Sequence, residues 1–272
     1  GIRMDILTLC NKINLQTEIK NKVLAFEKSF DFKTIDKQLK DFFVYKNMEK
    51  ARIELKTILG EDKDNIKMLM SMLKASTIAY ETYKRKGIED EIYFSTMKCY
   101  TRFIDETYKR TGRFYFDRDW WTTRQAGCHL FRIGALEYEI SHIDNKINIE
   151  LHIPSDSDLS PFSVDQSLTN AKKFFDKYYS EIENTEYYCH SWLLDSHLKT
   201  MLKEKSNIIE FQKRFEIFDV GEIDTEFIQW VFNKNSTDTD YTDFPEHTSL
   251  QRNIKKHLLS GGVIRSIYGK IK

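Results

Sequence analysis

The first hundred residues carry apolar side chains at the three- and four-residue spacing of α-helices. Such spacing recurs in three runs, at 35–43, 53–59 and 68–75, and it gathers the apolar side chains on one face of a helix. No proline interrupts this half, and Gly60 and Gly87 lie beyond the second and third runs, where a helix is expected to end. The pattern predicts a helical N-terminal domain over residues 1–112, with the methionine-rich third run in its core.

Beyond Gly112 the apolar period shortens to two, the period of β-strands. Residues 130–140 and 147–154 predict two strands joined by a polar turn, which is a hairpin. Apolar and polar residues alternate strictly from Ile147 to Ile153. The two kinds of side chain are therefore expected to face opposite sides of the sheet.

A helix and a buried strand are expected after the hairpin. Ser160 and Pro161 have the chemistry of an N-cap and a first helical position, and apolar residues recur at helical spacing from Val164 to Phe175. The nearly all-apolar run 187–194 predicts a strand that is buried on both faces. A right-handed crossover through the helix would make this strand parallel to strand 147–153.

The last eighty residues predict further helices and strands. Helices are expected at 197–203, from residue 206 or 207 onwards and through 250–259, and strands at 225–232 and after Gly261-Gly262. Asn207 to Glu210 has the pattern of a capping box, and 233–242 has that of an exposed loop. The whole pattern predicts an α+β fold, with a helical domain over 1–112 and a mixed sheet flanked by helices over 113–272.

Composition excludes several classes of protein. The 42 basic and 42 acidic residues cancel, whereas a nucleic-acid binder normally has a basic surplus. No apolar run is long enough to span a membrane and no signal-peptide pattern is present, so no membrane partner is expected. The cysteines stand far apart without a C-x-x-C pair, which favours a cytoplasmic protein, and the histidines lack H-x-x-H spacing, so no metal site is predicted.

A cysteine, a histidine and a serine stand side by side in the run YYCHSWLLD, at 189–191. Neighbouring side chains of a strand face opposite ways, so Cys189 and His190 cannot form a nucleophile–base pair with each other. Apolar surroundings also oppose formation of a thiolate. Cys189 is therefore expected in the core, and a hydrolase or acyl carrier that uses it is a minor alternative. His190 and Ser191 stay candidates on opposite faces.

Glu150 and His152 share the polar face of their strand and lie roughly 7 Å apart along it. A carboxylate and an imidazole that face one space can remove the proton of a substrate amine, directly or through water. The alternative is an ordinary solvated sheet face. The position supports the functional interpretation, because the strand ends at Pro154 and ligands of open sheets bind beyond the carboxyl ends of strands.

Three other places are suited to a ligand. The helix start from Ser160 to Val164 offers backbone N–H groups and a favourable dipole to an anion. Arg132 lies on the first strand of the hairpin, where it suits either an acidic substrate or the solvent. Trp121, in the aromatic segment 113–121, is a further candidate for contacting the substrate.

Long phrases of the sequence resemble a family of bacterial proteins in which a helical N-acyltransferase N-terminal domain precedes a GNAT-like C-terminal domain. The resemblance extends over nearly the whole chain and is carried by 80–106, 116–140, 147–159, 164–175, 187–195, 206–217, 230–232 and 244–252. Members of the GNAT superfamily move an acyl group from acyl-CoA to an amine. Their acyl-CoA lies between two parallel strands that splay apart, and its pyrophosphate binds at the helix start between them.

The resemblance implies which residues bind the co-substrate, expected to be acyl-CoA in the form of acetyl-CoA. The two splayed strands would be 147–153 and 187–194, and the pyrophosphate would bind where the intervening helix begins. The residues implied at the co-substrate are Leu151, Ile153, Ser160, Ser163 and Val164.

The resemblance also implies roles in the reaction. The amine of a small molecule or peptide would attack the thioester, whose oxyanion would be met by N–H groups of 150–153. Glu150 or His152 would take the proton of the amine. Ser191 or a tyrosine of the second half would protonate the leaving thiolate, and His190 would orient these groups or simply pack.

The loop 154–163 departs from the superfamily pattern. It has no glycine and holds two aspartates, Asp156 and Asp158, which repel a diphosphate. A binding module that kept the fold without the reaction is therefore the alternative function. For the helical domain the sequence leaves open three roles, which are a substrate lid, a homodimer surface and support for the sheet.

Overall fold

The computed structural model describes residues 2–182 and 184–272. Within these residues the chain divides into two compact units. Unit 1 comprises the chain up to residue 133 together with 139–146, and unit 2 comprises 134–138 and 147–272. The domain boundary expected after residue 112 stays a prediction.

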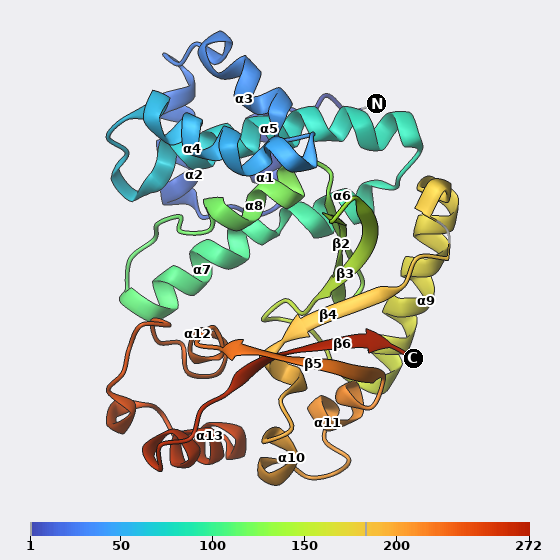
Figure 1. The fold of residues 1–272 in the computed structure, drawn as a ribbon. Helices are drawn as coiled ribbons and strands as arrows, with labels where there is room; N and C mark the ends of the chain where they lie inside the picture. The colour runs from blue at the N-terminus through green and yellow to red at the C-terminus, as the bar shows by residue number, and fades with distance from the viewer. Residues whose placement is uncertain (1, 183) are drawn as a thin grey trace. The chain divides into compact units, whose positions relative to one another are not determined.

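Unit 1 is mainly helical, as the spacing of its apolar residues predicts (Figure 1). Short 3₁₀ turns at 32–35, 45–47 and 63–65 lead into three of the helices. The helices are α1 (Ile6–Lys12), α2 (Thr17–Glu27), α3 (Asp36–Asp41), α4 (Met48–Leu59), α5 (Ile66–Lys86), α6 (Asp90–Met97), α7 (Cys99–Thr111) and α8 (Asp119–Ala126).

Helix α5 forms the centre of this unit, and its methionine-rich stripe is buried. The five residues of the predicted stripe are at most 1% exposed: Met68, Leu69, Met72, Leu73 and Ala75. The helix ends at Gly87, whose φ of +79° is a left-handed conformation that glycine adopts without a steric penalty. The core position and the C-terminus of this helix are therefore confirmed.

Helix α4 corrects one detail of the apolar pattern. Leu55 and Leu59 are buried as expected, but Ile53 and Ile58 are 54% and 46% exposed. The buried face of α4 includes Met48, at helical spacing from Leu55 and Leu59. The two isoleucines fall outside that face, so their spacing alone was misleading.

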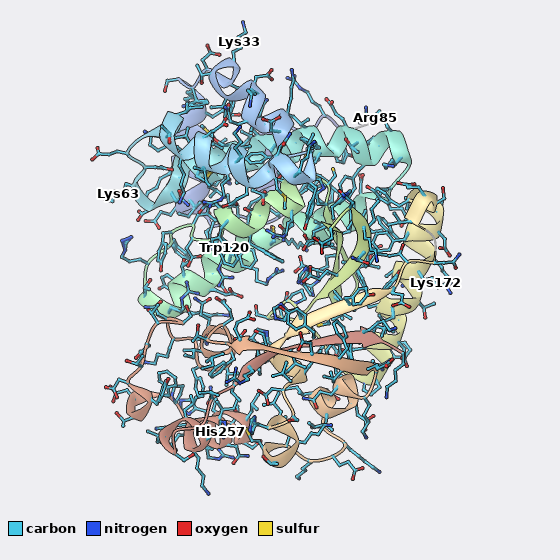
Figure 2. The ribbon with its side chains drawn as sticks, in the orientation of Figure 1. Lys33, Lys63, Arg85, Trp120, Lys172 and His257 are labelled. Carbon is cyan, nitrogen blue, oxygen red and sulfur yellow. The ribbon has the colours of Figure 1, made fainter. Side chains whose placement is uncertain are left out.

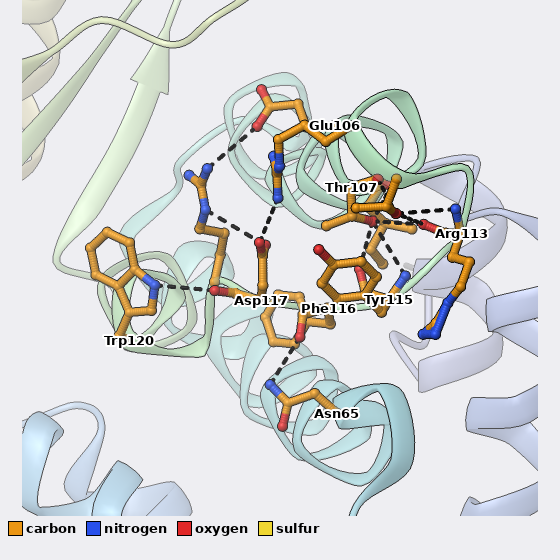
Figure 3. Close-up of polar contacts among 12 residues, drawn as sticks. Asn65, Glu106, Thr107, Arg113, Tyr115, Phe116, Asp117 and Trp120 are labelled. Atoms are coloured by element: carbon orange, nitrogen blue, oxygen red, sulfur yellow. Dashed lines mark hydrogen bonds and ion pairs between the residues drawn. The ribbon is translucent and has the colours of Figure 1, made fainter. Parts of the chain in front are cut away.

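The aromatic segment 113–118 between α7 and α8 is held to the helices by polar contacts (Figure 3). The Thr107 hydroxyl donates to the carbonyl of Tyr115 at 3.0 Å, and the Asn65 side-chain amide donates to the carbonyl of Phe116 at 3.1 Å. Each contact satisfies a backbone acceptor of a segment that has no regular hydrogen-bond ladder. The segment is thereby fixed within unit 1.

A mixed sheet of six strands is formed by the described residues, in the order β1-β2-β3-β4-β6-β5. Its strands are β1 (Leu130–Ile133), β2 (Leu136–Ile143), β3 (Lys146–His152), β4 (Tyr187–Ser191), β5 (Phe215–Ile223) and β6 (Arg265–Ile271). Strands β3 and β4 are parallel, whereas β4 with β6 and β6 with β5 are antiparallel. The predicted α+β fold and its parallel pair are confirmed. The single strand expected over 130–140 is instead two strands, β1 and β2, separated by a turn at Gly134 and Ala135, and the second strand of the expected hairpin is β3.

Helix α9 (Pro161–Tyr178) connects the parallel strands β3 and β4. Val164, Ala171 and Phe175 of its apolar face are buried, and Lys172 on the opposite side points outward (Figure 2). The Ser160 hydroxyl caps the helix by accepting the Ser163 N–H at 3.4 Å. The predicted N-cap and amphipathic helix are confirmed.

The segment after β4 is helical apart from β5 and β6. Its helices are α10 (Leu198–Met201), α11 (Asn207–Gln212), α12 (Phe227–Phe232) and α13 (Ser249–Leu259), with 3₁₀ turns at 192–194 and 241–243, and a further 3₁₀ turn at 180–182 precedes β4. Side chains of the helical segments pack into one apolar cluster that includes Trp192, Phe227, Ile254 and Leu258. This cluster forms a second core in unit 2.

Two predictions for this segment were wrong. The expected strand at 225–232 is helix α12, and strand β5 lies instead at 215–223, where no strand was predicted. The apolar residues Phe227, Ile228 and Phe232 are buried at helical spacing. A short apolar run cannot be assigned to a helix or a strand from its length alone, so helix formation here depended on packing.

Two further boundaries differ from expectation. The strand expected over 187–194 ends at Ser191, because residues 192–194 form a 3₁₀ turn. Helix α11 is capped by Ser206, whose hydroxyl accepts the Ile209 N–H at 3.4 Å, rather than by a capping box that begins at Asn207. The structure favours the serine because its side chain reaches the third N–H of the helix.

The described helices carry no membrane-crossing segment. None of them, within residues 2–182 and 184–272, combines the length and the apolar content that such a crossing needs.

Candidate active site

The pairing of β3 with β4 stops before either strand ends. Its register runs from Ile149 opposite Tyr187 to Leu151 opposite Cys189, although β3 continues to His152 and β4 to Ser191. The two parallel strands therefore part at their carboxyl ends. Ligands of open sheets bind at this end of the strands.

One backbone N–H at the point of separation has lost its strand partner. The Ile149 N–H donates to the carbonyl of Glu186, so Ile149 directs its N–H toward β4. N–H groups two and four residues later point the same way, which directs those of Leu151 and Ile153 toward β4. Within the described part of the chain the Ile153 N–H has no backbone acceptor. It is a donor aimed at the space between the parted strands.

On its other side β4 stays paired to β6 as far as Ser191, which lies opposite Ile267. His190 lies opposite Tyr268 on the same face of the sheet. Their rings stack with centroids 3.8 Å apart and planes 10° from parallel. The imidazole is therefore held flat against β6, next to the edge along which β4 leaves β3.

The Nε2 atom of His190 has no hydrogen-bond partner among the described residues, although it is covered from solvent. The nearest carboxylate oxygen is Oε1 of Glu222 at 3.6 Å, beyond hydrogen-bond distance. The His190 side chain as a whole is 27% exposed. The exposed part of the side chain is therefore not Nε2, and this covered nitrogen without a hydrogen bond would accept a proton from a substrate group that reaches it.

Aromatic rings extend this face of the sheet from β4 to β5. Tyr188 contacts Phe218 edge-on at 6.0 Å, and Phe218 lies 6.1 Å from the ring of Tyr268. The pKa of Tyr268 is raised, first by desolvation and then by the negative charges of Glu222, Asp219 and Glu150. Tyr268 is thus kept protonated and able to donate a proton.

Glu150 lies on this face, beside Tyr188 in the register of β3 and β4. It is half-buried, as is His152 at the end of β3. The two residues are two positions apart on one strand and share a face, as their alternation predicts. The structure therefore brings Glu150, His152 and His190 to one face of the parted strands.

Cys189 and Ser191 lie on the opposite face. Burial raises the pKa of the Cys189 thiol strongly, and the charge of Glu150 raises it further. Cys189 is 1% exposed, which confirms it as a core residue and disfavours a thiolate nucleophile. The Ser191 hydroxyl oxygen accepts the Leu193 N–H at 3.1 Å and so closes the turn that ends β4.

The start of α9, where a phosphate was expected, is occupied by a carboxylate of the chain itself. Asp158 accepts from the Ser160 N–H at 2.9 Å and from the Ser163 hydroxyl at 2.8 Å. These bonds lower the pKa of Asp158, with the Ser160 N–H as the largest cause. The nearby Val164 is buried. Asp158 thus already uses hydrogen-bond donors at this helix end that could otherwise bind a phosphate.

Arg214, between α11 and β5, supplies the positive charge that the loop lacks. Its guanidinium donates to Asp165 and, at 3.3 Å, to the carbonyl of Pro161, so it lies against the first turn of α9. Two negative groups at this helix start, Asp158 and Asp165, are therefore accompanied by one arginine. The sequence gives no local sign of this contact, because Arg214 is about fifty residues away.

Arg132 and Trp121 both belong to unit 1. Arg132 is a half-buried residue of β1, and its backbone N–H donates to the Thr96 hydroxyl at 2.9 Å. Trp121 lies on α8 with the guanidinium of Arg124 over its ring, 4.4 Å from the centroid. The substrate role of both residues stays a prediction.

Sequence reasoning missed the residues that β5 and β6 bring to His190. Glu222 and Gly221 were not candidates, because β5 was not recognised as a strand, and Tyr268 was covered only by the general expectation of a tyrosine from the second half. The alternation of Phe215, Ile217 and their acidic neighbours was the available signal. It identifies a strand but does not reveal that the strand pairs with β6.

Two family models match the chain, and together they span nearly all of it. Residues 4–128 match an N-acyltransferase N-terminal domain, and residues 130–271 match a GNAT-like C-terminal domain. No curated protein is detectably similar in sequence.

Solved structures of acyltransferases are similar in fold. An acyltransferase in complex with decanoyl-CoA and teicoplanin has a TM-score of 0.82 at 21% identity, over 97% of this chain and 86% of the other. An acyltransferase mutant in complex with octanoyl-CoA has a TM-score of 0.82 at 20% identity, with the same coverage. A complex with CoA and 10C-teicoplanin has a TM-score of 0.81 at 20% identity, again over 97% and 86%. At this level of identity the likeness establishes the fold.

Proposed function

We propose that this chain, which belongs to the family of proteins with a GNAT-like C-terminal domain, transfers an acyl group from acyl-CoA to an amine. The observation that carries the proposal is the separation of β3 from β4. It leaves the Ile153 N–H without a backbone partner among the described residues, next to a strand whose His190 lacks a hydrogen bond at Nε2. An oxyanion donor and a base are thereby available at one end of the sheet.

The Ile153 N–H would bind the thioester oxygen. Attack of the amine nitrogen on the carbonyl carbon forms a C–N bond and moves negative charge onto this oxygen. A fixed backbone donor stabilises that charge more than it stabilises the neutral carbonyl. As the intermediate collapses, the C–S bond breaks and CoA leaves as a thiolate.

His190 is the best-supported base for the proton that the attacking amine loses. Its ring is fixed by stacking on Tyr268, and its Nε2 has no hydrogen-bond partner in the described chain. Glu150, with His152 as the other candidate from the sequence, lies on the same face and would act directly or through water.

Tyr268 is the best-supported acid for the leaving thiolate. Its raised pKa keeps the phenol protonated, so its hydroxyl would give a proton to the sulfur, and solvent would replace that proton. Ser191 was the other candidate from the sequence. It lies on the opposite face with its oxygen already accepting a hydrogen bond, which favours the tyrosine.

The diphosphate of CoA would bind at the start of α9, near Ser160 and Ser163. The residues there fit the group only in part. Arg214 and the helix N-terminus favour an anion, whereas the carboxylate of Asp158 competes for the same donors. Binding would therefore require Asp158 to move aside or to share these donors with the phosphate.

For the acyl donor and the acceptor we propose chemical classes rather than single compounds. Acetyl-CoA was expected from the sequence resemblance, while the structural neighbours were solved with octanoyl-CoA and decanoyl-CoA. We include medium-chain acyl groups among the donors. One neighbour was solved with teicoplanin, which supports an amine of a small molecule or peptide as the acceptor class.

Thermal unfolding with acyl-CoA tests the proposal. A ligand at 100 times its Kd stabilises a protein by about 2.7 kcal/mol, which corresponds to a Tm increase of about 5–10 °C for a chain of this size. Acetyl-CoA, octanoyl-CoA and decanoyl-CoA are compared, with free octanoate as the control for the acyl chain alone. If none of the three raises Tm, the proposal is wrong.

A binding module without the reaction is the second candidate, and the carboxylate of Asp158 at the start of α9 favours it. Turnover separates the two functions. A Tm shift accompanied by release of CoA from octanoyl-CoA with primary amines supports the transferase. A shift without turnover supports the binding module. If Asp158 only competes with the phosphate, Asp158→Asn should bind CoA at least as tightly as the wild type.

A further inference from the structure

Strand β5 contains an irregularity opposite β6 at Gly221 and Glu222. Val220 lies opposite Ile267, and Ile223 lies opposite Arg265. Between these two pairs, Gly221 and Glu222 of β5 therefore lie opposite one residue of β6, Ser266. This is the arrangement of a β-bulge, which bends a strand and redirects a side chain.

The bulge decides which face of the sheet Glu222 occupies. Asp219 lies opposite Tyr268, so Asp219 shares the face of His190. Strict alternation from Asp219 would put Glu222 on the other face, because the two are three residues apart. The extra residue restores Glu222 to the His190 face, where its carboxylate reaches to 3.6 Å from Nε2.

Gly221 allows β5 to come this close. A Cβ at this position would lie 2.6 Å from the carbonyl oxygen of Ser266, 3.0 Å from the Tyr268 ring and 3.2 Å from Nε2 of His190. The first of these distances is to backbone, which cannot easily move away. Only glycine fits this approach without displacing β6. The bulge is further held by Arg265, which donates to the carbonyl of Gly221 at 3.3 Å.

We propose that Glu222 is a positioning residue for the transfer reaction, aimed at His190 by the bulge of β5. The proposal rests on the proposed function, in which His190 takes the amine proton. Stacking on Tyr268 fixes the plane of the imidazole, and within that plane Nε2 has no hydrogen-bond partner among the described residues. The Glu222 carboxylate lies 3.6 Å from Nε2, and a small movement of this exposed side chain would bring it into hydrogen-bond distance and hold the ring in the remaining direction.

The other charged and titratable groups around His190 have different roles. Tyr188 lies two residues before His190 on β4, and its hydroxyl donates to the carboxylate of Glu186 at 3.2 Å. Asp219 and Glu150 influence Tyr268 electrostatically. Glu222 is the acidic group whose carboxylate lies 3.6 Å from Nε2 of the imidazole. It is also 66% exposed, so it can be replaced without opening a cavity.

The experiment is a double-mutant cycle between Glu222 and His190. Release of CoA from octanoyl-CoA is measured with a panel of primary amines, consisting of alkylamines, amino sugars and short peptides, and the most active amine is used for kinetics. Glu222→Gln should lower kcat by about tenfold, with the KM for octanoyl-CoA unchanged. In a His190→Ala background the same substitution should cause no further loss. An equal loss in both backgrounds, or no loss in the wild type, would overturn the proposal.

Glu216→Gln is the matched control. Glu216 lies on the same strand, is exposed, and stands opposite Lys270 instead of beside the imidazole. The Glu216→Gln substitution should leave kcat unchanged. A loss equal to that of Glu222→Gln would indicate a general effect of removing charge from β5 and would contradict the proposal. Glu222→Asp, which keeps the charge on a shorter side chain, should recover part of the lost kcat.

A measurement that does not depend on turnover separates this proposal from the proposed function. In protein labelled with ¹³C-histidine, the ring signals of His190 are identified by their loss in His190→Gln. These signals should shift in Glu222→Gln and remain in place in Glu216→Gln. A shift in a protein without transferase activity supports the contact and refutes the reaction. Unmoved signals refute the positioning role whatever the activity.

Discussion

The two sides of β4 differ in how far their pairing extends. Toward β3 the parallel register ends at Leu151 and Cys189, while toward β6 the antiparallel register continues to Ser191 and Ile267. One side is open at the carboxyl end and the other is closed. The open side exposes a backbone donor, and the closed side fixes a side chain.

This difference indicates how one strand can serve both needs of an acyl transfer. A donor for an oxyanion must be free of other partners, whereas a base must be held in place. The open edge provides the Ile153 N–H, and the paired edge provides a stacked His190. The proposed reaction depends on both edges, so each can be tested by itself.

The largest effect is expected from removing the base on the paired side. His190→Ala should lower kcat by about 10²–10⁴-fold, because a positioned general base contributes this much to a rate. Steady-state kinetics with octanoyl-CoA and an amine measure the effect. His247→Ala is the control, since His247 is an exposed histidine of the same unit, and it should keep full activity. Wild-type turnover in His190→Ala would exclude this residue as the base.

Removing the donor on the open side should have the next largest effect. Ile153→Pro eliminates the backbone N–H, and loss of one oxyanion donor typically lowers kcat by about 10²–10³-fold. Ile153→Ala shortens the side chain but keeps the N–H, so it controls for the apolar contact of Ile153 with its cluster. Equal activity of the two variants would show that the N–H has no part in the reaction.

A smaller effect, on stability, is expected from adding a methyl group where β5 approaches β6 closely. Gly221→Ala places a methyl group 2.6 Å from the Ser266 carbonyl oxygen, and such overpacking typically costs about 1–3 kcal/mol. Denaturant unfolding measures the change in the free energy of unfolding. Val220→Ala, next in the chain and 61% exposed, should stay within about 0.5 kcal/mol of the wild type. A neutral Gly221→Ala would mean that the strands separate easily.

The smallest effect is expected at the start of α9. The pKa of Asp158 is lowered from its ordinary value of 3.8 by its hydrogen bonds. A carboxylate whose pKa is lower in the folded than in the unfolded state stabilises the fold at pH values above the unfolded-state pKa. This stabilisation is lost as the pH falls through the folded-state pKa. Asp158→Asn should therefore lower Tm slightly at neutral pH, and its difference from the wild type should shrink as the pH falls below 3.8. Thermal scans across this range test the sign, and a constant difference would contradict it.

Elements whose signals are local were predicted well from the sequence. The stripe of α5, the capping serine of α9 and the alternation of β3 each depend on residues within a few positions of one another. Strand alternation also places His190 and Cys189 on opposite faces of the sheet. Strand β3, helix α9 and strand β4 followed one another in the predicted order.

Elements whose conformation depends on distant partners were predicted poorly. Residues 225–232 have an apolar run that suits either a helix or a strand, and packing of Phe227 and Phe232 in the second core decided for the helix. Strand β5 forms by pairing with β6, which follows it by more than forty residues. Local pattern cannot specify that pairing.

The sequence by itself determined the class of fold, the order of the main elements and the face on which each candidate side chain lies. It did so because period, capping and alternation are properties of neighbouring residues. The tertiary structure alone decided where β3 leaves β4, how β5 bulges around Gly221, and which carboxylate meets His190. These features depend on register between strands far apart in the chain, where one added residue moves a side chain from one face of the sheet to the other.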